Sequence, residues 1–429
     1  MNRYSFCPNP GLGRRREQGQ AFLATVLLVG LAAAAVVYAL ASPNNVTLDS
    51  DKKTMDALAQ ARDALIGRAA ADGSIPGSLP CPDLLTNNGT SNVPNDGVAD
   101  LLAGNDCPSY VGRLPWRTLG LSDLRDGYGE RLWYALSRNF RDDNSASPLN
   151  SDTAGQLTIQ DGAGNTLASN VIAIVFAAGP PIGTQVRDAA NQNNVANYLE
   201  GENANGAPPS DNLFVSALAS STFNDKLLAV TGDALFAVVA MRVAREVRSA
   251  LEAYRTAHGY YPAANPYGTG SPYACSPTIF KGRLPLAISS GCSTQSDWAG
   301  ELPTWFAANN WNLLTHYAVS ETCTVNNFAA SSICDAFGGD PVNALGYGPS
   351  GAPLTITGIT SGAKLLVIVT GRLLGSQARP CASAADCLED AANTDGDNVY
   401  VKPSRFPASN DRMAATCGNT SPYTCSTSP

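Results

Sequence analysis

The amino-acid sequence predicts an α+β protein: a long N-terminal membrane-spanning helix, then two tandem repeats, each an amphipathic helix packed on an antiparallel β-sheet. Three observations lead to this prediction. An unbroken apolar run occupies residues 21–41, two segments about 186 residues apart resemble one another, and each segment opens with a helical apolar pattern followed by short strand patterns. The chain has 429 residues, which is enough for two heads of ordinary domain size.

The apolar run at 21–41 is long enough to cross a membrane as a helix. At ~1.5 Å per residue it would span about 30 Å, the thickness of a bilayer's hydrocarbon core. The basic cluster Arg14-Arg15-Arg16 precedes the run and a long polar chain follows it. The positive-inside rule therefore places residues 1–19 in the cytoplasm and the chain after about residue 49 outside. We expect a cytoplasmic leader at 1–19 and a transmembrane helix at 20–48.

After Pro43 an amphipathic helix is expected from Thr54 to Ala71, ended by Gly73 and Pro76. Pro43 either bends one continuous helix or ends the membrane segment. Apolar residues recur every three or four positions and predict one buried face. They are Met55, Leu58, Ala61, Leu65 and Ala69.

The second half of the chain repeats landmarks of the first half in the same order, which indicates an internal duplication. The helix and the turn after it match without a gap. Gly-Arg-Leu-Pro at 112–115 has two candidate matches, at 282–285 and at 300–303 as Gly-Glu-Leu-Pro. The other matched pairs are 62–65 and 248–251, 73–76 and 259–262, 134–137 and 317–320, 157–159 and 354–356, 171–176 and 365–369, 199–200 and 388–389, and 224–226 and 410–412.

The duplication predicts a first head at 49–224 and a second at 225–429. Short strands without helices between them favour an antiparallel sheet. The second copy's helix is expected at 233–258, with its apolar first half, 234–239, buried between the heads. Strands are expected at 132–136, 156–159, 171–176 and 213–215, and at 316–319, 354–356, 365–369 and 399–401.

Cysteine usage indicates an oxidising compartment. Cys7 lies in the leader, and the other ten cysteines follow the apolar run, an even number that suits disulfides. Zinc ligation is the competing interpretation, but no Cys-x-x-Cys spacing is present. Spacing does not establish the pairing. The simplest one joins neighbours: Cys81 with Cys107, Cys275 with Cys292, Cys323 with Cys334, Cys381 with Cys387, and Cys417 with Cys425.

Three interpretations of the N-terminus predict different mature ends. A secretory signal peptide would be cut after Ala41, and a plain signal anchor would not be cut. In the third, the run Arg14-Arg15-Arg16-Glu17-Gln18-Gly19 before Gln20-Ala21-Phe22-Leu23-Ala24 resembles the leader of type IV pilin-like proteins. Prepilin peptidase cuts such leaders after a glycine directly before the apolar helix, so the cut would fall between Gly19 and Gln20.

The resemblance implies a pilin or pseudopilin whose first helix packs on its own head. The implied partners are other pilin or pseudopilin subunits, the inner-membrane assembly platform and prepilin peptidase, with membrane contact through residues 21–41. The implied localisation is the inner membrane, as a single-pass protein with a cytoplasmic N-terminus and periplasmic or extracellular heads. Pilins usually have glutamate as the fifth mature residue, where this chain has Ala24, and this departure argues against a place along a filament shaft.

The composition predicts neither nucleic-acid binding nor catalysis. The net charge is −8, and no basic stripe suited to phosphates is present. The only histidines are His258, at a helix end, and His316, in an expected strand, and both are interpreted as structural. Ser361 and Lys364 have the Ser-x-x-Lys spacing of penicillin-binding enzymes, but they lead into a strand rather than a helix. No catalytic residue is assigned.

One acidic group could hold calcium, the only cofactor considered. Glu389, Asp390, Asp395 and Asp397 surround a glycine turn, and oxygen ligands on such a turn suit calcium. The alternative is a plain hairpin turn at Asp-Gly. The first copy holds a less charged set at this place: Glu200, Glu202, Asn203, Asn205 and Asp211.

Tryptophans gather around the Leu-Pro motifs of both copies. Large aromatics at equivalent places of a repeat are expected to fill the core beneath a sheet, and a surface binding platform is the alternative. They are Trp116, Trp133, Trp305 and Trp311, with Trp298 nearby.

The expected function is structural: a minor pilin or pseudopilin of a type IV pilus or type II secretion-like assembly, at the tip or in initiation. Two heads would be difficult to pack helically within a thin filament. The principal alternative is a membrane-anchored periplasmic or cell-surface binding protein outside any filament. A secreted hydrolase is a third possibility.

Overall fold

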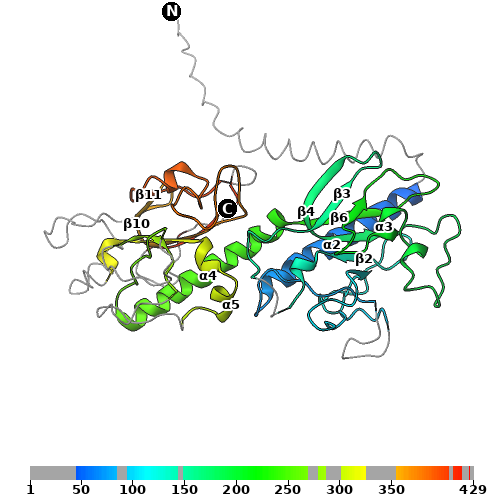
Figure 1. Ribbon diagram of the computed structural model, residues 1–429, viewed down its shortest axis with the longest axis horizontal. Helices are drawn as coiled ribbons and strands as arrows, with labels where there is room; N and C mark the ends of the chain where they lie inside the picture. Colours follow the sequence, from blue (N-terminus) through cyan, green and yellow to red (C-terminus); the bar gives the residue numbers. More distant parts are fainter. Residues whose placement is uncertain are drawn as a thin grey trace, which may run out of the picture. The chain divides into compact units, whose positions relative to one another are not determined.

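The computed structural model describes residues 45–84, 94–143, 148–268, 279–286, 301–324, 354–404, 409–417 and 425. The chain divides into two compact units, Met1–Lys52 and Lys53–Pro429, and the description below concerns the second. Figure 1 shows that this unit contains two curled sheets, each with its own long helix. We call α2 with β1–β6 the first lobe, and α4 with β7–β12 the second lobe.

The expected membrane-spanning helix is not found. No helix among the described residues is long and apolar enough to cross a membrane. The prediction of a transmembrane helix at 20–48, and the single-pass inner-membrane localisation that depended on it, are therefore contradicted. The described helix that overlaps this range, α2 (Asn45–Ala71), carries Asp49, Asp51 and Lys52 in its first turns. The apolar run 21–41 itself lies outside the described residues.

Helix α2 begins earlier than expected and buries one stripe. Leu58, Ala61, Leu65 and Ala69 are fully buried, as the apolar spacing predicts. Met55, assigned to the same face, is instead 46% exposed. It lies off the buried stripe of α2, because its neighbours Thr54 and Ala57 are only 2% and 5% exposed.

Helix α4 (Gly232–His258) closely matches the prediction of 233–258. The Thr231 side chain accepts a hydrogen bond from the Ala234 N–H at 3.3 Å and caps its N-terminus. Gly259, with φ of 84°, takes the left-handed conformation that ends the helix. Its apolar start is buried on one side only, because Leu235 and Phe236 are covered while Val238 is 45% exposed.

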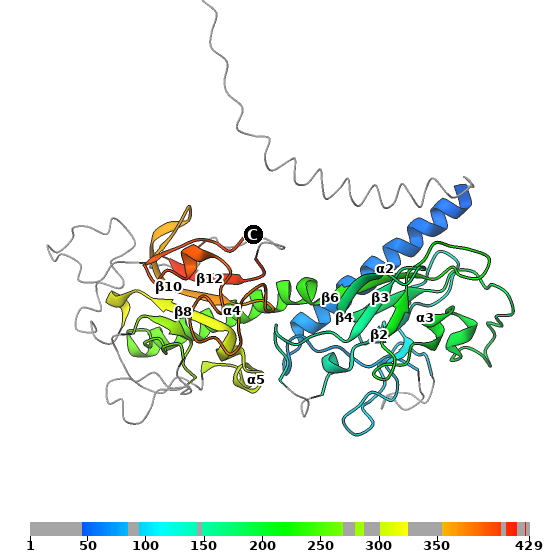
Figure 2. The same cartoon turned by 45° about the horizontal axis from the view of Figure 1, so that its top comes forward.

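The two sheets have the same strand order. In the first, β1-β2-β4-β3-β5 form a path and β6 pairs with β4. In the second, β7-β8-β10-β9-β11 form the equivalent path and β12 pairs with β10. Figure 2 labels β2, β3, β4 and β6 in the first sheet and β8, β10 and β12 in the second. The strands of the first sheet are β1 (Val111–Arg113), β2 (Trp133–Leu136), β3 (Leu157–Gln160), β4 (Thr166–Ala177), β5 (Leu213–Val215) and β6 (Lys226–Thr231). Those of the second are β7 (Lys281–Arg283), β8 (Thr315–Val319), β9 (Leu354–Ile356), β10 (Thr360–Val369), β11 (Val399–Tyr400) and β12 (Arg412–Cys417).

The predicted antiparallel sheet is wrong in one respect. Each sheet contains one parallel pair, β3 with β5 and β9 with β11. A long connection carries the chain across the sheet before β5 and before β11, so these strands enter in the same direction as their neighbours. The short helices described are α3 (Glu202–Asn205), α5 (Thr304–Ala308), η1 (Arg138–Phe140), η2 (Val195–Asn197), η4 (Trp311–Leu314), η5 (Glu321–Cys323) and η7 (Ala391–Asn393).

Strand register shows which residues correspond between the lobes. Arg113 lies opposite Trp133, and Arg283 lies opposite His316, so the Gly-Arg-Leu-Pro match is the one at 282–285. The first sheet continues through β6 to Thr231, beyond the head boundary predicted at 224/225.

The gapless match of the turn after the helix is wrong. Tyr134 Oη donates to the Pro80 carbonyl at 3.3 Å, and Tyr317 Oη donates to the Pro262 carbonyl at 2.9 Å. Pro262 therefore corresponds to Pro80 and not to Pro76. The first lobe has a longer loop between its helix and this position.

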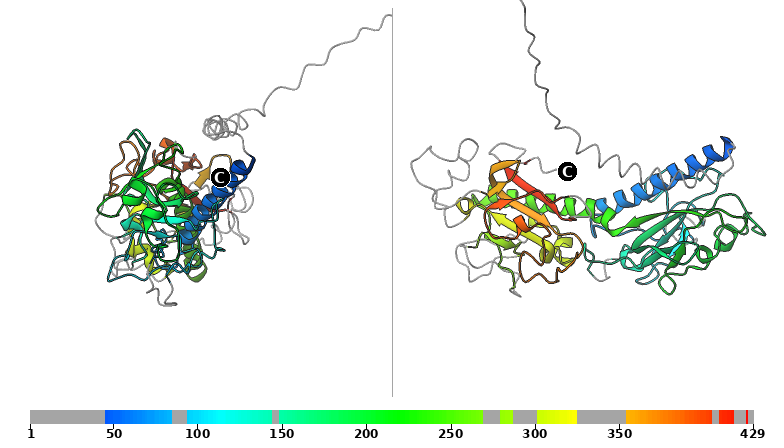
Figure 3. Two further views of the ribbon diagram at one scale, coloured as in Figure 1. Left: turned by 90° about the vertical axis from the view of Figure 1, so that its right-hand side faces the viewer. Right: turned by 90° about the horizontal axis from the view of Figure 1, so that it is seen from above.

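The two lobes share one hydrophobic core. It includes Leu65 and Tyr134 of the first lobe and Val243, Tyr254 and Val367 of the second. Figure 3 shows α4 running along the second sheet, where its buried stripe faces β10 and β12.

Hydrogen bonds also join the lobes. Arg242 Nη1 donates to the carbonyls of Ala70 and Asp72, both at 2.6 Å, and so caps the C-terminal end of α2. The Asn309 side chain accepts from the Leu149 N–H at 2.8 Å. The lobes are therefore expected to unfold together.

Three of the five predicted disulfides lie within the described residues and are formed: Cys81–Cys107, Cys381–Cys387 and Cys417–Cys425. Cys323 is also disulfide-bonded. Its predicted partner Cys334, and the predicted pair Cys275 and Cys292, lie outside the described residues.

Removing Cys81–Cys107 as a pair, by Cys81→Ala with Cys107→Ala, should lower the free energy of unfolding by about 3–4 kcal/mol. The bond closes a loop with a sequence separation of 26, and loop closure restricts the unfolded chain. Removing Cys381–Cys387, with a separation of 6, should cost about 2–3 kcal/mol. Urea unfolding of the two double variants measures both values, and a larger loss for the shorter loop would contradict the loop-entropy explanation.

The tryptophans are mostly core residues, as predicted. Trp133 and Trp311 are fully buried and Trp305 is 4% exposed. Trp116 is half-buried and packs against Gly97, where an added Cβ would overlap the indole ring. Trp298 lies outside the described residues.

Candidate functional site: a duplicated carboxyl network

A pair of acidic residues occupies a buried polar site in the first lobe. Asp225 Oδ2 accepts from the Glu200 N–H at 2.9 Å and from Asn203 Nδ2 at 3.0 Å. Glu200 Oε2 accepts the backbone N–H groups of Asn224 at 3.0 Å and of Asp225 at 3.2 Å. Its Oε1 accepts from Gln185 at 2.7 Å. The pair therefore joins the loop after β4 to the residue before β6.

The second lobe repeats this arrangement with Glu389 and Asp411. Asp411 Oδ2 accepts from the Glu389 N–H, and its Oδ1 accepts from the Gly371 N–H, both at 3.3 Å. Glu389 Oε2 accepts from Ser409 Oγ at 2.7 Å, and its Oε1 accepts from Gln377 at 3.5 Å. The acid, the glutamine and the glutamate thus recur at equivalent places of the duplication.

Burial raises the pKa of the aspartate in each pair. Burial, and then the charge of Glu200, raises the pKa of Asp225 to about 8. Burial and the charge of Glu389 raise the pKa of Asp411 well above its ordinary value. Asp225 is 4% exposed and Glu200 is 8% exposed. These shifts favour the protonated form of Asp225 and of Asp411 beside the carboxylates of Glu200 and Glu389.

An asparagine extends the network to the edge of each sheet. Asn203 Nδ2 donates to the Val215 carbonyl at 3.0 Å, and its Oδ1 accepts from the Val215 N–H at 2.8 Å. Asn393 makes the same two bonds to Val401, at 3.1 and 2.8 Å. These amides imitate a neighbouring strand, because they satisfy a backbone donor and acceptor at once.

The predicted calcium residues are not brought together. Glu389 belongs to the buried pair, and Asp390 caps η7. Asp395 and Asp397 accept from backbone N–H groups of their own turn, while Lys281 Nζ donates to the carbonyls of that turn. Within the part of the chain that the structure describes, no three His, Cys, Asp or Glu side chains form a group that could hold a metal ion. Each carboxylate already has a local donor.

In the first copy only two of the five residues compared with the calcium group enter the network. They are Glu200 and Asn203. The Asp211 carboxylate accepts from the Leu213 N–H at 3.0 Å in its own turn.

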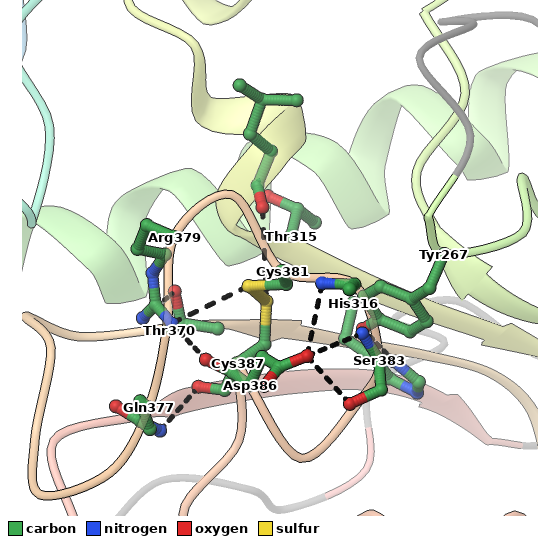
Figure 4. The surroundings of a disulfide bond; sticks show 12 residues. Tyr267, Thr315, His316, Thr370, Gln377, Arg379, Cys381, Ser383, Asp386 and Cys387 are labelled. Atoms are coloured by element: carbon green, nitrogen blue, oxygen red, sulfur yellow. Dashed lines mark hydrogen bonds between the residues drawn. A yellow bond between two sulfur atoms is a disulfide. The ribbon is translucent and has the colours of Figure 1, made fainter.

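The disulfide loop of the second lobe connects to its carboxyl network. Gln377, which contacts Glu389, donates to the Cys387 carbonyl at 2.8 Å. Asp386 accepts from the backbone N–H and the hydroxyl of Ser383, both at 2.8 Å, and Arg379 donates to the Asp386 carbonyl. Figure 4 shows these contacts around the Cys381–Cys387 bond.

His316 is a buried core residue of β8, as its interpretation as structural requires. Its Nδ1 lies 2.7 Å from Tyr267 Oη, and the two rings are stacked; Figure 4 shows them beside the disulfide loop. Burial lowers the pKa of His316 to about 4, with a smaller contribution from Lys281. His316 takes the register position of Trp133, which in the first lobe stacks on the Arg113 guanidinium at 4.1 Å. His258 ends α4, and Lys364 lies within β10.

Sequence reasoning missed Asp225 and Asp411. Both stand in a matched pair of segments, 224–226 and 410–412, so the duplication was the signal that could have found them. The network uses its oxygen atoms to accept backbone and amide donors, which fixes loops in place.

The chain matches no protein-family model, no curated protein and no solved structure.

Proposed function

We propose that this chain is a structural subunit of minor pilin or pseudopilin type in a type IV pilus or type II secretion-like assembly. The observation that carries the proposal is the order of elements in both lobes: one long helix followed by a sheet against which it packs. The leader-like residues 14–24 add a second line of support, because they resemble a prepilin peptidase site between Gly19 and Gln20. Prepilin peptidase, other pilin or pseudopilin subunits and the assembly platform are the proposed partners.

The disulfides support a role outside the cytoplasm. Three bonds are formed within the described residues, and such bonds persist in oxidising compartments. The duplicated carboxyl network supports a structural role, because its acids are buried and hold the chain's own loops.

A position at the filament tip, or in its initiation, follows from the fused lobes and from Ala24. Two lobes joined by a shared core form one large subunit. Labelled antibody against the native chain should mark one end of purified filaments. Regular labelling along the shaft would rule out the tip position.

A groove in the first lobe favours the second candidate function, a binding protein that joins no filament. The groove has a volume of about 520 Å³ and mixes apolar and polar groups. Arg138 and Asp106 form a bidentate ion pair there, with both bonds at 2.7 Å. Residues lining the groove include Leu84, Tyr110, Val111, Val195 and Pro209. Whether maturation of the chain depends on prepilin peptidase distinguishes the two candidate functions.

A further inference from the structure

Most strands at the margins of the two sheets have their outer backbone groups occupied. Asn203 and Asn393 cover the outer edges beside β5 and β11. Ser109 Oγ bonds both the N–H and the carbonyl of Val111 in β1. Asn265 pairs with Arg283 in β7. Exposed strand edges attract other strands, and these contacts prevent such pairing.

Cys425 lies against the outer side of strand β12. The Cys425 N–H donates to the Ala415 carbonyl at 3.4 Å, and Cys425 is bonded to Cys417 at the end of β12. Cys425 is 8% exposed and joins the apolar cluster that contains Met413 and Ala415, each 2% exposed. Cys425 thus occupies an outward carbonyl at the margin of the second sheet.

Strand β6 holds the same position in the first sheet, but among the described strands it pairs with β4 alone. Ala229 lies opposite Ile174, as Ala415 lies opposite Leu366, and Leu227 corresponds in the same way to Met413. Because strand groups alternate in direction, the N–H and carbonyl groups of Leu227 and Ala229 point away from β4. No described residue bonds to these outward groups.

The side chains at this margin show the same difference. Leu227 and Ala229 are only partly buried against the cluster around Trp133 and Phe176, whereas Met413 and Ala415 are fully buried. The only charged residue of β6 is Lys226 at its start, and residues 227–231 carry no charge, although charged residues are the usual protection of an exposed edge.

We propose that the outer edge of β6 is a docking site for an extended segment of another polypeptide, which adds antiparallel to β6. The segment would present a small apolar side chain to Leu227 and Ala229, the place that Cys425 takes in the second lobe. Its backbone would supply the missing hydrogen bonds, as in other cases of strand addition. The inference goes beyond the proposed function and holds whether or not the chain joins a filament.

The test uses the full chain and a synthetic peptide of residues 418–429, whose only cysteine is Cys425. Thr231 stands where Cys417 stands in the second lobe, so the variant Thr231→Cys should capture the peptide as a mixed disulfide in a glutathione buffer. Capture should be about tenfold faster than in the control Leu218→Cys, a 57% exposed position before β6. In the captured complex, hydrogen exchange at the Leu227 and Ala229 amides should slow. Equal capture rates with unchanged exchange would overturn the proposal.

Ala229→Pro gives an independent check. Proline removes an N–H that points outward, so the bonds between β4 and β6 remain, and an edge strand tolerates this change. Added to Thr231→Cys, it should abolish the rate advantage with little change in melting temperature, whereas Leu228→Pro should destabilise the sheet. A dimer of the native chain in sedimentation experiments that Ala229→Pro abolishes would assign the edge to a second copy and overturn the proposal of a different polypeptide.

Discussion

Replacing Phe236 by alanine should lower the free energy of unfolding by about 3–5 kcal/mol. Phe236 lies on α4 and is 4% exposed. Its ring centroid is 6.1 Å from that of Phe140 in the first lobe and 6.2 Å from that of Trp311 in the second. Truncation leaves a cavity in the core that the two lobes share, and little can move to fill it.

The same substitution should separate the unfolding of the two lobes. A shared core makes unfolding a single transition, and weakening it allows each lobe to unfold alone. Urea titration followed by hydrogen exchange at β2 and at β8 reports on the lobes separately. Val238→Ala is the matched control, because Val238 is on the same helix and 45% exposed; it should change stability by less than about 0.5 kcal/mol. Equal losses for the two variants would contradict the shared core.

The carboxyl pairs should make the protein less stable as the pH rises. The pKa of Asp225 is about 8 in the folded chain and about 3.9 in an unfolded one. Below about pH 4 both states hold the proton; between these values only the folded state holds it. The contribution of this proton to the free energy of unfolding is therefore fully present below about pH 4. It is lost as the pH rises towards 8, by up to about 1.4 kcal/mol per pH unit.

Asp225→Asn should remove this dependence, because an amide can donate where the protonated carboxyl does. The difference in free energy of unfolding between the variant and the native chain should grow in the variant's favour from about pH 4 to pH 8. Taking this difference cancels contributions common to both proteins, including that of His316. Asp188→Asn, an exposed position in the loop after β4 that also carries Glu200, should leave the dependence unchanged. A pH-independent difference for Asp225→Asn would contradict the shared proton.

Part of the local structure was predictable because its signals are local, whereas β1, β6, β7 and β12 were not among the predicted strands. The helix at 233–258 and the strands at 213–215 and 354–356 have patterns that burial on one side enforces, and the structure places them within a residue. The neighbouring cysteine pairs also follow from short spacing, because a closed loop of a few residues costs little entropy.

Contacts between strands and side chains that lie far apart in the sequence were less predictable. The parallel entry of β5 and β11 depends on where a long connection crosses the sheet, and composition does not encode this. Likewise, the contact between Asp225 and Glu200 is non-local and forms only when β4, α3 and β5 have folded together. Met55 satisfied the helical spacing, but Thr54 rather than Met55 continues the buried stripe of α2. An isolated acid in a loop has no local pattern, so only the duplication distinguished Asp225 and Asp411 from surface residues.

The central claim is that the chain is a prepilin peptidase substrate of pilin type. The intact mass of the protein recovered from cells with and without an active prepilin peptidase tests this claim most directly. A mature chain that starts at Gln20 only when the peptidase is active is the predicted result. A chain that starts at Met1 or Ser42 in both cells would contradict the claim and leave a two-lobed binding protein.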